Sequence, residues 1–90
     1  MLASEKPQRK PDYQIETIDG ELLLFHPAQE KVFYCNETAA LIWQLCDGQK
    51  TVTEIVALLS EAFPEAASEI EEDVETTLRA LHEHGAIEFV

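Results

Sequence analysis

The hydrophobic pattern of this chain changes from a strand period to a helix period at Asn36, and this change limits the folds open to it. Before Asn36 the apolar side chains alternate over residues 13–18 or form a short run over residues 22–25. Strands produce such patterns because successive side chains point to opposite faces of a sheet. After Asn36 the apolar residues recur every three or four positions, which is the spacing of one helix face. The sequence therefore predicts strands followed by helices.

The strand-like part divides into three strands. Asp19 and Gly20 separate the first two strands, and both residues tolerate the positive φ angles of a two-residue hairpin turn. Residues 26–30 form the next turn, and residues 31–35 are a short, aromatic and β-branched third strand. We expect a three-stranded antiparallel meander with the third strand at an edge.

Three helices are predicted after the strands. Asn36 can cap the first helix, and Gly48 fits the left-handed position that follows its last turn. Residues 51–54 have capping-box spacing and open the second helix, which Pro64 ends. Residues 68–71 repeat the capping box and open the third helix.

Each predicted helix carries an apolar stripe that should face one common core. The stripe residues are Ala39, Ile42, Trp43 and Cys46, then Val52, Ile55, Val56, Leu59 and Phe63, then Ile70, Val74, Leu78 and Leu81. Gly85 ends the third helix, and residues 86–90 are extended and could return to the sheet. The predicted fold is α+β and winged-helix-like, with an N-terminal three-stranded antiparallel sheet, a three-helix bundle and a short C-terminal strand.

Ninety residues are enough for one modest core. Residues 1–12 contain two prolines and no apolar period, so we expect a disordered N-terminal tail at 1–12 and one domain at 13–90. No run approaches the roughly 18 apolar residues of a membrane span. The first ten residues lack the apolar stretch of a secretory signal. We therefore expect a cytoplasmic protein without a membrane partner.

The net charge is −12, and residues 68–90 alone hold seven acids against Arg79. Nucleic-acid binding draws much of its affinity from cations placed on phosphates. The one basic cluster, Lys6, Arg9 and Lys10, lies in the predicted tail. A winged-helix DNA-binding transcriptional regulator is the alternative function, because the same fold serves both roles. It predicts a basic recognition helix, and neither the second nor the third helix is basic.

The sequence contains no catalytic signature. It has no Gly-rich phosphate loop, no Gly-x-Ser-x-Gly and no HExxH. His82 and His84 point about 200° apart on a helix and cannot easily share a metal ion. Cys35 and Cys46 have no CxxC spacing and no adjacent base, so we expect small buried hydrophobes. We expect no enzyme activity, no cofactor and no metal.

The third strand offers an edge to which another strand could add. Residues 32–35 are uncharged, so little prevents this edge from pairing. With one flank of the third helix beside it, the edge would form a groove for β-strand addition, in which backbone hydrogen bonds hold a peptide and pockets select it. Acidic walls would favour a peptide with basic flanks. Self-pairing through the same edge, which would produce a dimer, is a further alternative.

The chain resembles the PqqD-like proteins, the peptide-chaperone family named for pyrroloquinoline quinone biosynthesis. The resemblance covers about residues 13–90 and rests on Asn36-Glu37-Thr38-Ala39-Ala40, Trp43, Asp47-Gly48, Thr51-Val52, Glu54-Ile55, Asp73-Val74, Leu78, Leu81 and Gly85. Cys35 departs from the pattern, since the family commonly has leucine at this position.

The resemblance implies a RiPP recognition element, a non-catalytic domain that binds the leader segment of a ribosomally made precursor peptide. The domain would present this peptide to a modifying enzyme, often a radical-SAM enzyme. The family's leader pairs with the third strand and packs on the third helix. Carried over to this chain, the implied peptide-binding residues are Val32, Phe33, Tyr34, Cys35, Asp73, Val74, Thr77, Leu78 and Leu81. Some of these should be core residues, because three of them belong to the apolar stripe.

Overall fold

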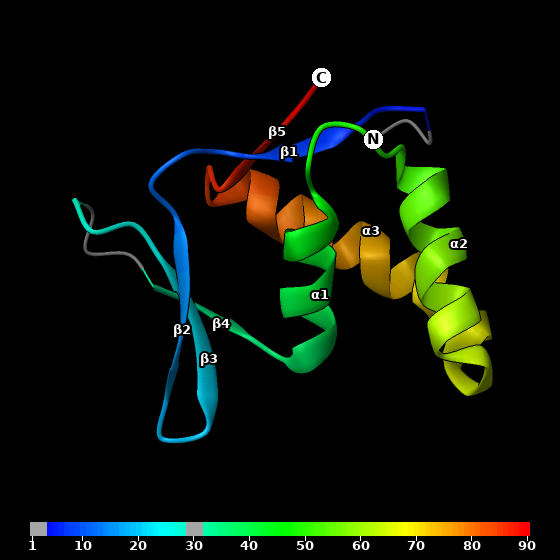
Figure 1. Cartoon of the computed structure of the whole chain (residues 1–90), viewed down its shortest axis with the longest axis horizontal. Coiled ribbons are helices and arrows are strands. Elements are labelled where there is room, and N and C mark those ends of the chain that lie inside the picture. Colours follow the sequence, from blue (N-terminus) through cyan, green and yellow to red (C-terminus); the bar gives the residue numbers. More distant parts are fainter. Residues whose placement is uncertain (1–3, 29–31) are drawn as a thin grey trace.

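The computed structural model describes residues 4–28 and 32–90. Its elements in chain order are β1 (Pro7–Arg9), β2 (Gln14–Ile18), β3 (Glu21–Phe25), β4 (Val32–Cys35), α1 (Glu37–Leu45), α2 (Val52–Ala62), the 3₁₀ turn η1 (Pro64–Ala66), α3 (Ala67–Glu83) and β5 (Ile87–Phe89). Figure 1 shows the hairpin of β2 and β3 on one side of the molecule and α2 on the other. The predicted order of strands, helices and a terminal strand is confirmed.

The main sheet is antiparallel, with the strand order β2-β3-β4. Asp19 and Gly20 have φ angles of 53° and 80°, so the predicted hairpin turn with two positive φ angles is confirmed. β3 is central, and β4 is an edge strand as predicted. Residues 29–30 of the second predicted turn and Lys31 of the third predicted strand lie outside the described residues.

The caps of the first two helices are as predicted. Asn36 Oδ1 accepts a hydrogen bond from the Ala39 N–H at 2.7 Å. The Thr51 hydroxyl accepts from the Glu54 N–H at 3.1 Å, and the Glu54 carboxylate accepts from the Thr51 N–H at 3.0 Å. The bond from the Thr51 backbone holds the pKa of the Glu54 carboxyl below its ordinary value. No helix in the two described segments is both long and apolar enough to cross a membrane.

The predicted capping box at Ser68 is wrong. α3 begins at Ala67, its N-cap is Ala66, and no side chain caps it. The reason lies in Pro64, whose fixed φ starts the turn η1, which leads directly into the helix. The other end of α3 is as predicted, since Gly85 has a φ of 78° and donates to the His82 carbonyl at 3.0 Å.

The core lies between the sheet and the helices, and α3 provides its largest face. Ile70, Val74, Leu78 and Leu81 of α3 are at most 3% exposed. They pack with buried residues of β3, α1, α2 and β5. Phe63 was predicted to join this core, which is wrong, because it is 43% exposed. α2 ends at Ala62, and the extended backbone of Phe63, with a φ of −130°, takes its side chain off the buried stripe.

The prediction of a disordered tail is wrong for residues 4–12. β1 pairs antiparallel with β5, so the C-terminal strand joins β1 instead of the main sheet. The Arg9 N–H donates to the Cys46 carbonyl at 2.8 Å, and the Gly48 N–H donates to the Pro7 carbonyl at 3.0 Å. Figure 1 shows β1 lying beside β5 and close to the loop between α1 and α2. The segment is ordered because it bonds to parts of the chain that are far away in sequence.

Two hydroxyl substitutions distinguish the observed helix starts from the predicted ones. Thr51→Ala should lower the free energy of unfolding by about 1 kcal/mol, because it removes a cap. Part of the capping contribution should also disappear as the pH falls through the lowered pKa of Glu54. Ser68→Ala should change the unfolding free energy by less than about 0.5 kcal/mol, because Ser68 lies inside α3. Urea unfolding of the two variants measures both values, and equal losses would contradict the observed start of α3.

Candidate functional site

β4 presents two different sets of side chains. Phe33 and Cys35 turn toward the core, and Cys35 is 9% exposed. Val32 and Tyr34 turn to the outer face of the sheet, where they are 44% and 70% exposed. The strand therefore has one face in the core and one face open to solvent.

The backbone of β4 also alternates. In a two-residue hairpin the residues that flank the turn form a hydrogen-bonded pair, and bonded and non-bonded pairs then alternate along an antiparallel ladder. Counted through the register of β2, β3 and β4, this alternation directs the backbone N–H and C=O groups of Phe33 and Cys35 toward β3. The backbone groups of Val32 and Tyr34 therefore point away from β3, toward the free edge.

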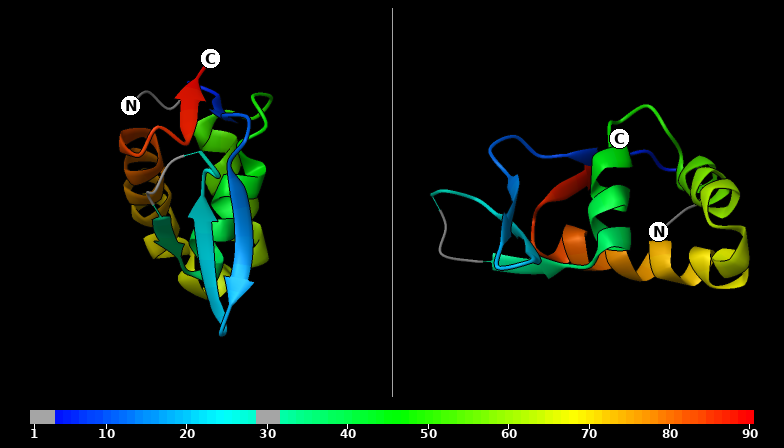
Figure 2. Two further views of the ribbon diagram at one scale, coloured as in Figure 1. Left: turned by 90° about the vertical axis from the view of Figure 1, so that its left-hand side faces the viewer. Right: turned by 60° about the horizontal axis from the view of Figure 1, so that its bottom comes forward.

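This free edge lies beside one flank of α3. Asp73, Thr77, Ala80 and His84 recur at three- and four-residue intervals, so they share one side of the helix. At the C-terminal end of α3 the imidazole of His84 meets the Phe33 ring edge-on, with 4.9 Å between the ring centroids. The left view of Figure 2 shows α3 running alongside β4. We call the space between these two elements the β4–α3 groove.

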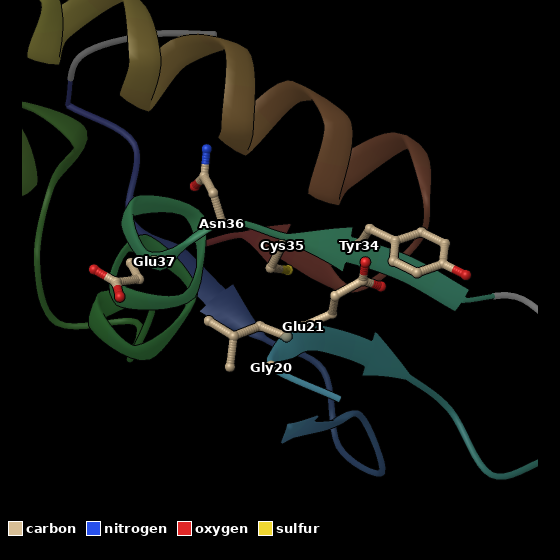
Figure 3. A pocket seen from close by; sticks show the side chains of 7 residues that line it. Gly20, Glu21, Tyr34, Cys35, Asn36 and Glu37 are labelled. Carbon is tan, nitrogen blue, oxygen red and sulfur yellow. The ribbon is translucent and has the colours of Figure 1, made fainter. Parts of the chain in front are cut away.

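A hollow of ≈ 260 Å³ lies at the end of the β4–α3 groove where β4 leads into α1. Its lining residues are all polar, namely Asn36, Thr38, Glu72, Asp73, Thr76 and Thr77. A second hollow of ≈ 840 Å³ adjoins the first at Asn36 and is lined by Gly20, Glu21, Leu22, Tyr34, Cys35, Asn36 and Glu37. Figure 3 shows Asn36 at the end of β4 with its side chain directed toward α3. A chain that lay along the free edge of β4 would reach the first hollow, whereas the second lies on the β3 side of the strand.

The charge around these hollows is negative. Two acids, Glu72 and Asp73, line the first hollow, and two more, Glu21 and Glu37, line the second. No lysine or arginine is among the described residues that line either hollow. The described lining therefore attracts positive charge and offers no cation to a phosphate group.

Five of the residues implied by the resemblance lie at the β4–α3 groove, and four do not. Val32, Phe33 and Tyr34 belong to its strand wall, and Asp73 and Thr77 belong to its helix wall. The remaining residues are Cys35, Val74, Leu78 and Leu81, and a peptide contact by any of them stays a prediction. Val74, Leu78 and Leu81 are 0% exposed and Cys35 is 9% exposed, because their side chains form the core.

Several residues of the site were not singled out from the sequence for this role, among them Asn36, Thr38, Glu72, Thr76 and His84. A signal for the helix wall was present. The flank from Asp73 to His84 has the same period as the apolar stripe, displaced to the next side of the helix. Asn36 was recognised only as a helix cap, although its place directly after the edge strand puts it at the groove.

The cysteines and histidines do not form a reactive or metal-binding site. Burial raises the pKa of the Cys46 thiol to about 12 and also raises that of Cys35. Cys46 Sγ donates to the Ile42 carbonyl at 3.1 Å. His82 packs on Phe89 while His84 packs on Phe33, so the two rings have different neighbours. Within residues 4–28 and 32–90, no group of three or more His, Cys, Asp or Glu side chains could hold a metal ion.

The thiols should be inert while the protein is folded. At pH 8 both cysteines should resist alkylation by iodoacetamide, because burial limits access and disfavours the thiolate. The same reagent should modify both cysteines in 8 M urea, which serves as the control. Intact-mass spectrometry measures the modification, and rapid labelling of native Cys35 would contradict its buried position.

An open strand edge beside a helix flank has the geometry of domains that take up an extended peptide as an added strand. The family model for Coenzyme PQQ synthesis protein D (PqqD) matches residues 21–87, and the chain belongs to this family. A protein of Klebsiella pneumoniae (strain 342) named PqqA binding protein is 51% identical over 56 residues, which are 62% of this chain and 56% of that protein. The match thus spans little more than half of that relative's length.

Another relative has the same name, and two solved structures share the fold. A PqqA binding protein of Pseudomonas paraeruginosa is 37% identical over 70 residues, which cover 78% of this chain and 73% of that protein. The structure of TbiB1 in complex with the TbiA(beta) leader peptide has a TM-score of 0.69 and 25% identity, and the match covers 90% of this chain and 94% of that chain. The PqqD part of Methylobacterium extorquens PqqCD, described as a RiPP recognition element, shares the fold, with a TM-score of 0.71, 23% identity, and coverage of 91% and 87%.

Proposed function

We propose that this protein binds the leader segment of a ribosomally made precursor peptide in the β4–α3 groove and presents it to a modifying enzyme. The observation that carries the proposal is the free edge of β4, where the backbone groups of Val32 and Tyr34 point toward the space beside α3. The names of the relatives, PqqA binding protein, and the leader peptide bound to TbiB1 support this choice of ligand.

The free energy of binding must come from more than the backbone. The N–H and C=O groups of Val32 and Tyr34 can form four hydrogen bonds, which contribute about 4 kcal/mol at about 1 kcal/mol each. Micromolar affinity requires about 8 kcal/mol after association costs of at least about 4 kcal/mol. Three or four apolar side chains buried at about 1.5–3 kcal/mol each would close the difference. A leader that fits should therefore alternate apolar residues along the segment that pairs with β4.

The chemistry of the two hollows further restricts the ligand. Four acids line them, so a leader with Lys or Arg beside its pairing segment should be favoured. The protein would contribute binding and placement, and the chemistry would belong to the partner enzyme, for which a radical-SAM enzyme is the candidate. We infer a cytoplasmic setting, because ribosomally made precursors and their modifying enzymes meet there and because Cys35 and Cys46 are free thiols.

An amide-resolved NMR titration tests the proposal directly. The labelled protein is titrated with synthetic leader segments of the short peptides encoded beside its gene, and with duplex DNA for comparison. We expect shifts confined to residues 32–36 and to the α3 flank from Asp73 to His84. Silence toward every leader, with salt-sensitive shifts on DNA, would instead support the transcriptional-regulator alternative.

Proline substitution tests the docking edge. Tyr34→Pro removes a backbone donor that points to the free edge and should weaken leader binding at least about tenfold, which corresponds to about 1.4 kcal/mol. Thr17→Pro is the matched control, because the backbone N–H of Thr17 also points away from β3. It lies on β2, at the opposite edge of the same sheet. Isothermal titration calorimetry measures both affinities, and circular dichroism verifies that both variants fold. Equal affinities for the two folded variants would exclude β4 as the docking edge.

A charge on the helix wall tests the other side of the groove. Thr77→Glu adds a bulky carboxylate to the half-buried position next to Asp73 and should weaken leader binding about tenfold. Ser68→Glu places the same charge at an exposed position near the start of α3, outside the groove, and should leave the affinity within about twofold of the wild type. Fluorescence anisotropy of a labelled leader measures both variants. A leader that binds Thr77→Glu as tightly as the wild type would place the ligand elsewhere.

A further inference from the structure

A second apolar surface lies away from the β4–α3 groove, between α1 and α2. Both helices pack on α3, but they have few direct contacts with each other. Their apolar side chains stay uncovered, so that Leu41, Leu58 and Phe63 are 37%, 42% and 43% exposed. A hollow of ≈ 350 Å³ lies between them, lined by Leu41, Gln44, Leu45, Leu58, Leu59, Ala62 and Phe63. We call this space the α1–α2 cleft.

The shape of the α1–α2 cleft fits a helix. Leu41 and Leu45 of α1 are four residues apart, and so are Leu58 and Ala62 of α2, so each wall presents a row of side chains along its helix. Six of the seven lining residues are apolar, and Gln44 is the exception. An apolar stripe at positions i, i+4 and i+7 of an inserted helix would pack between the two rows, as in other helix-in-groove complexes.

The charge around the cleft favours a basic partner helix. Glu61 and Glu65 flank Phe63, and the last turn of α2 carries no base that would offset the negative end of its dipole. Lys50 lies in the loop before α2, where its ammonium pairs with Asp47 at 2.5 Å. A second copy of this chain, with its own net charge of −12, would be repelled. A helix with lysine or arginine beside its apolar stripe would be attracted.

We propose that the α1–α2 cleft is the docking site for an amphipathic, basic helix of the enzyme that modifies the bound peptide. The proposal rests on the proposed function, since it assigns the enzyme a contact on the peptide carrier. The cleft shares no lining residue with either hollow of the peptide site. The enzyme and the leader can therefore be held at the same time, each by its own surface.

The cleft can be tested with a defined probe before the enzyme is known. An 18-residue model helix of leucine and lysine, with leucines on one face, is titrated into the labelled protein, and a leucine and glutamate helix of the same pattern is the control. We expect the lysine helix to shift amides of residues 41–45 and 58–63, and the glutamate helix to shift none. Shifts that centre on the acids of α3 would overturn the proposal, because they would show attraction by charge alone.

Two uncharged substitutions then test the contact with the enzyme itself. Leu58→Gln should weaken binding of the modifying enzyme encoded beside the gene at least about fivefold, because it removes half-exposed apolar area that the enzyme would bury. Ile18→Gln is the matched control, since Ile18 is 48% exposed on the outer face of the sheet, and it should leave this affinity unchanged. Biolayer interferometry with leader-loaded protein measures both variants.

Leader affinity tests the peptide site, and enzyme affinity tests the α1–α2 cleft. Leu58→Gln should bind the leader as the wild type does, because Leu58 is outside the peptide site. Undiminished enzyme binding by Leu58→Gln, or a loss caused by Ile18→Gln, would overturn the cleft as the docking site. A protein that forms dimers through residues 41–63 at high concentration would also overturn it, in favour of a second copy. If the wild-type protein did not bind the leader but bound the lysine helix in the cleft, only the proposed peptide function would be refuted.

Discussion

The buried face of α3 is the packing surface on which the rest of the molecule depends. Ile70, Val74, Leu78 and Leu81 contact the sheet, α1, α2 and β5, and they are almost fully excluded from water. At about 1.5–3 kcal/mol for each buried side chain, this single stripe contributes more than any cap or ion pair in the molecule. Both candidate binding surfaces result from it. The flank of α3 next to the stripe lies opposite β4, and the two helices that rest on the stripe stand apart and leave a cleft.

Features determined by neighbours in sequence could be predicted from the sequence. The hairpin turn at Asp19 and Gly20 and the capping box at Thr51 depend on residues within four positions of each other, and both are confirmed. β1 could not be predicted, because three polar or imino residues become a strand only through partners about eighty positions away in β5. The predicted burial of Phe63 was wrong for a related reason. The helical period alone does not show that α2 ends at Ala62, one residue before it.

The candidate site shows the same division between local and long-range information. The edge position of β4 followed from the order of the strands, and its uncharged sequence indicated that it could pair. The helix wall was harder, because periodicity identifies the apolar stripe of α3 but not the side that meets β4. Val74, Leu78 and Leu81 were implied by resemblance, yet the core uses them. The residues that remain for a ligand are the polar and small ones one step around the helix, such as Thr77 and Ala80.

Neither α1 nor α2 carries a lysine or arginine that could bind a phosphate group. In this chain the guanidinium of Arg9 lies 5.4 Å from the centre of the Trp43 ring and donates to the Gln44 carbonyl. The cation thereby ties β1 to the end of α1 and offsets the negative end of that helix. What α1 and α2 expose is apolar with acidic flanks, which suits a basic protein helix and repels a duplex. Salt would weaken the attraction by charge at both surfaces, but the backbone edge of β4 and the leucines of the cleft depend little on it. Specificity should therefore come from the strand edge and the apolar rows, and the net charge of −12 should mainly speed the approach of basic partners.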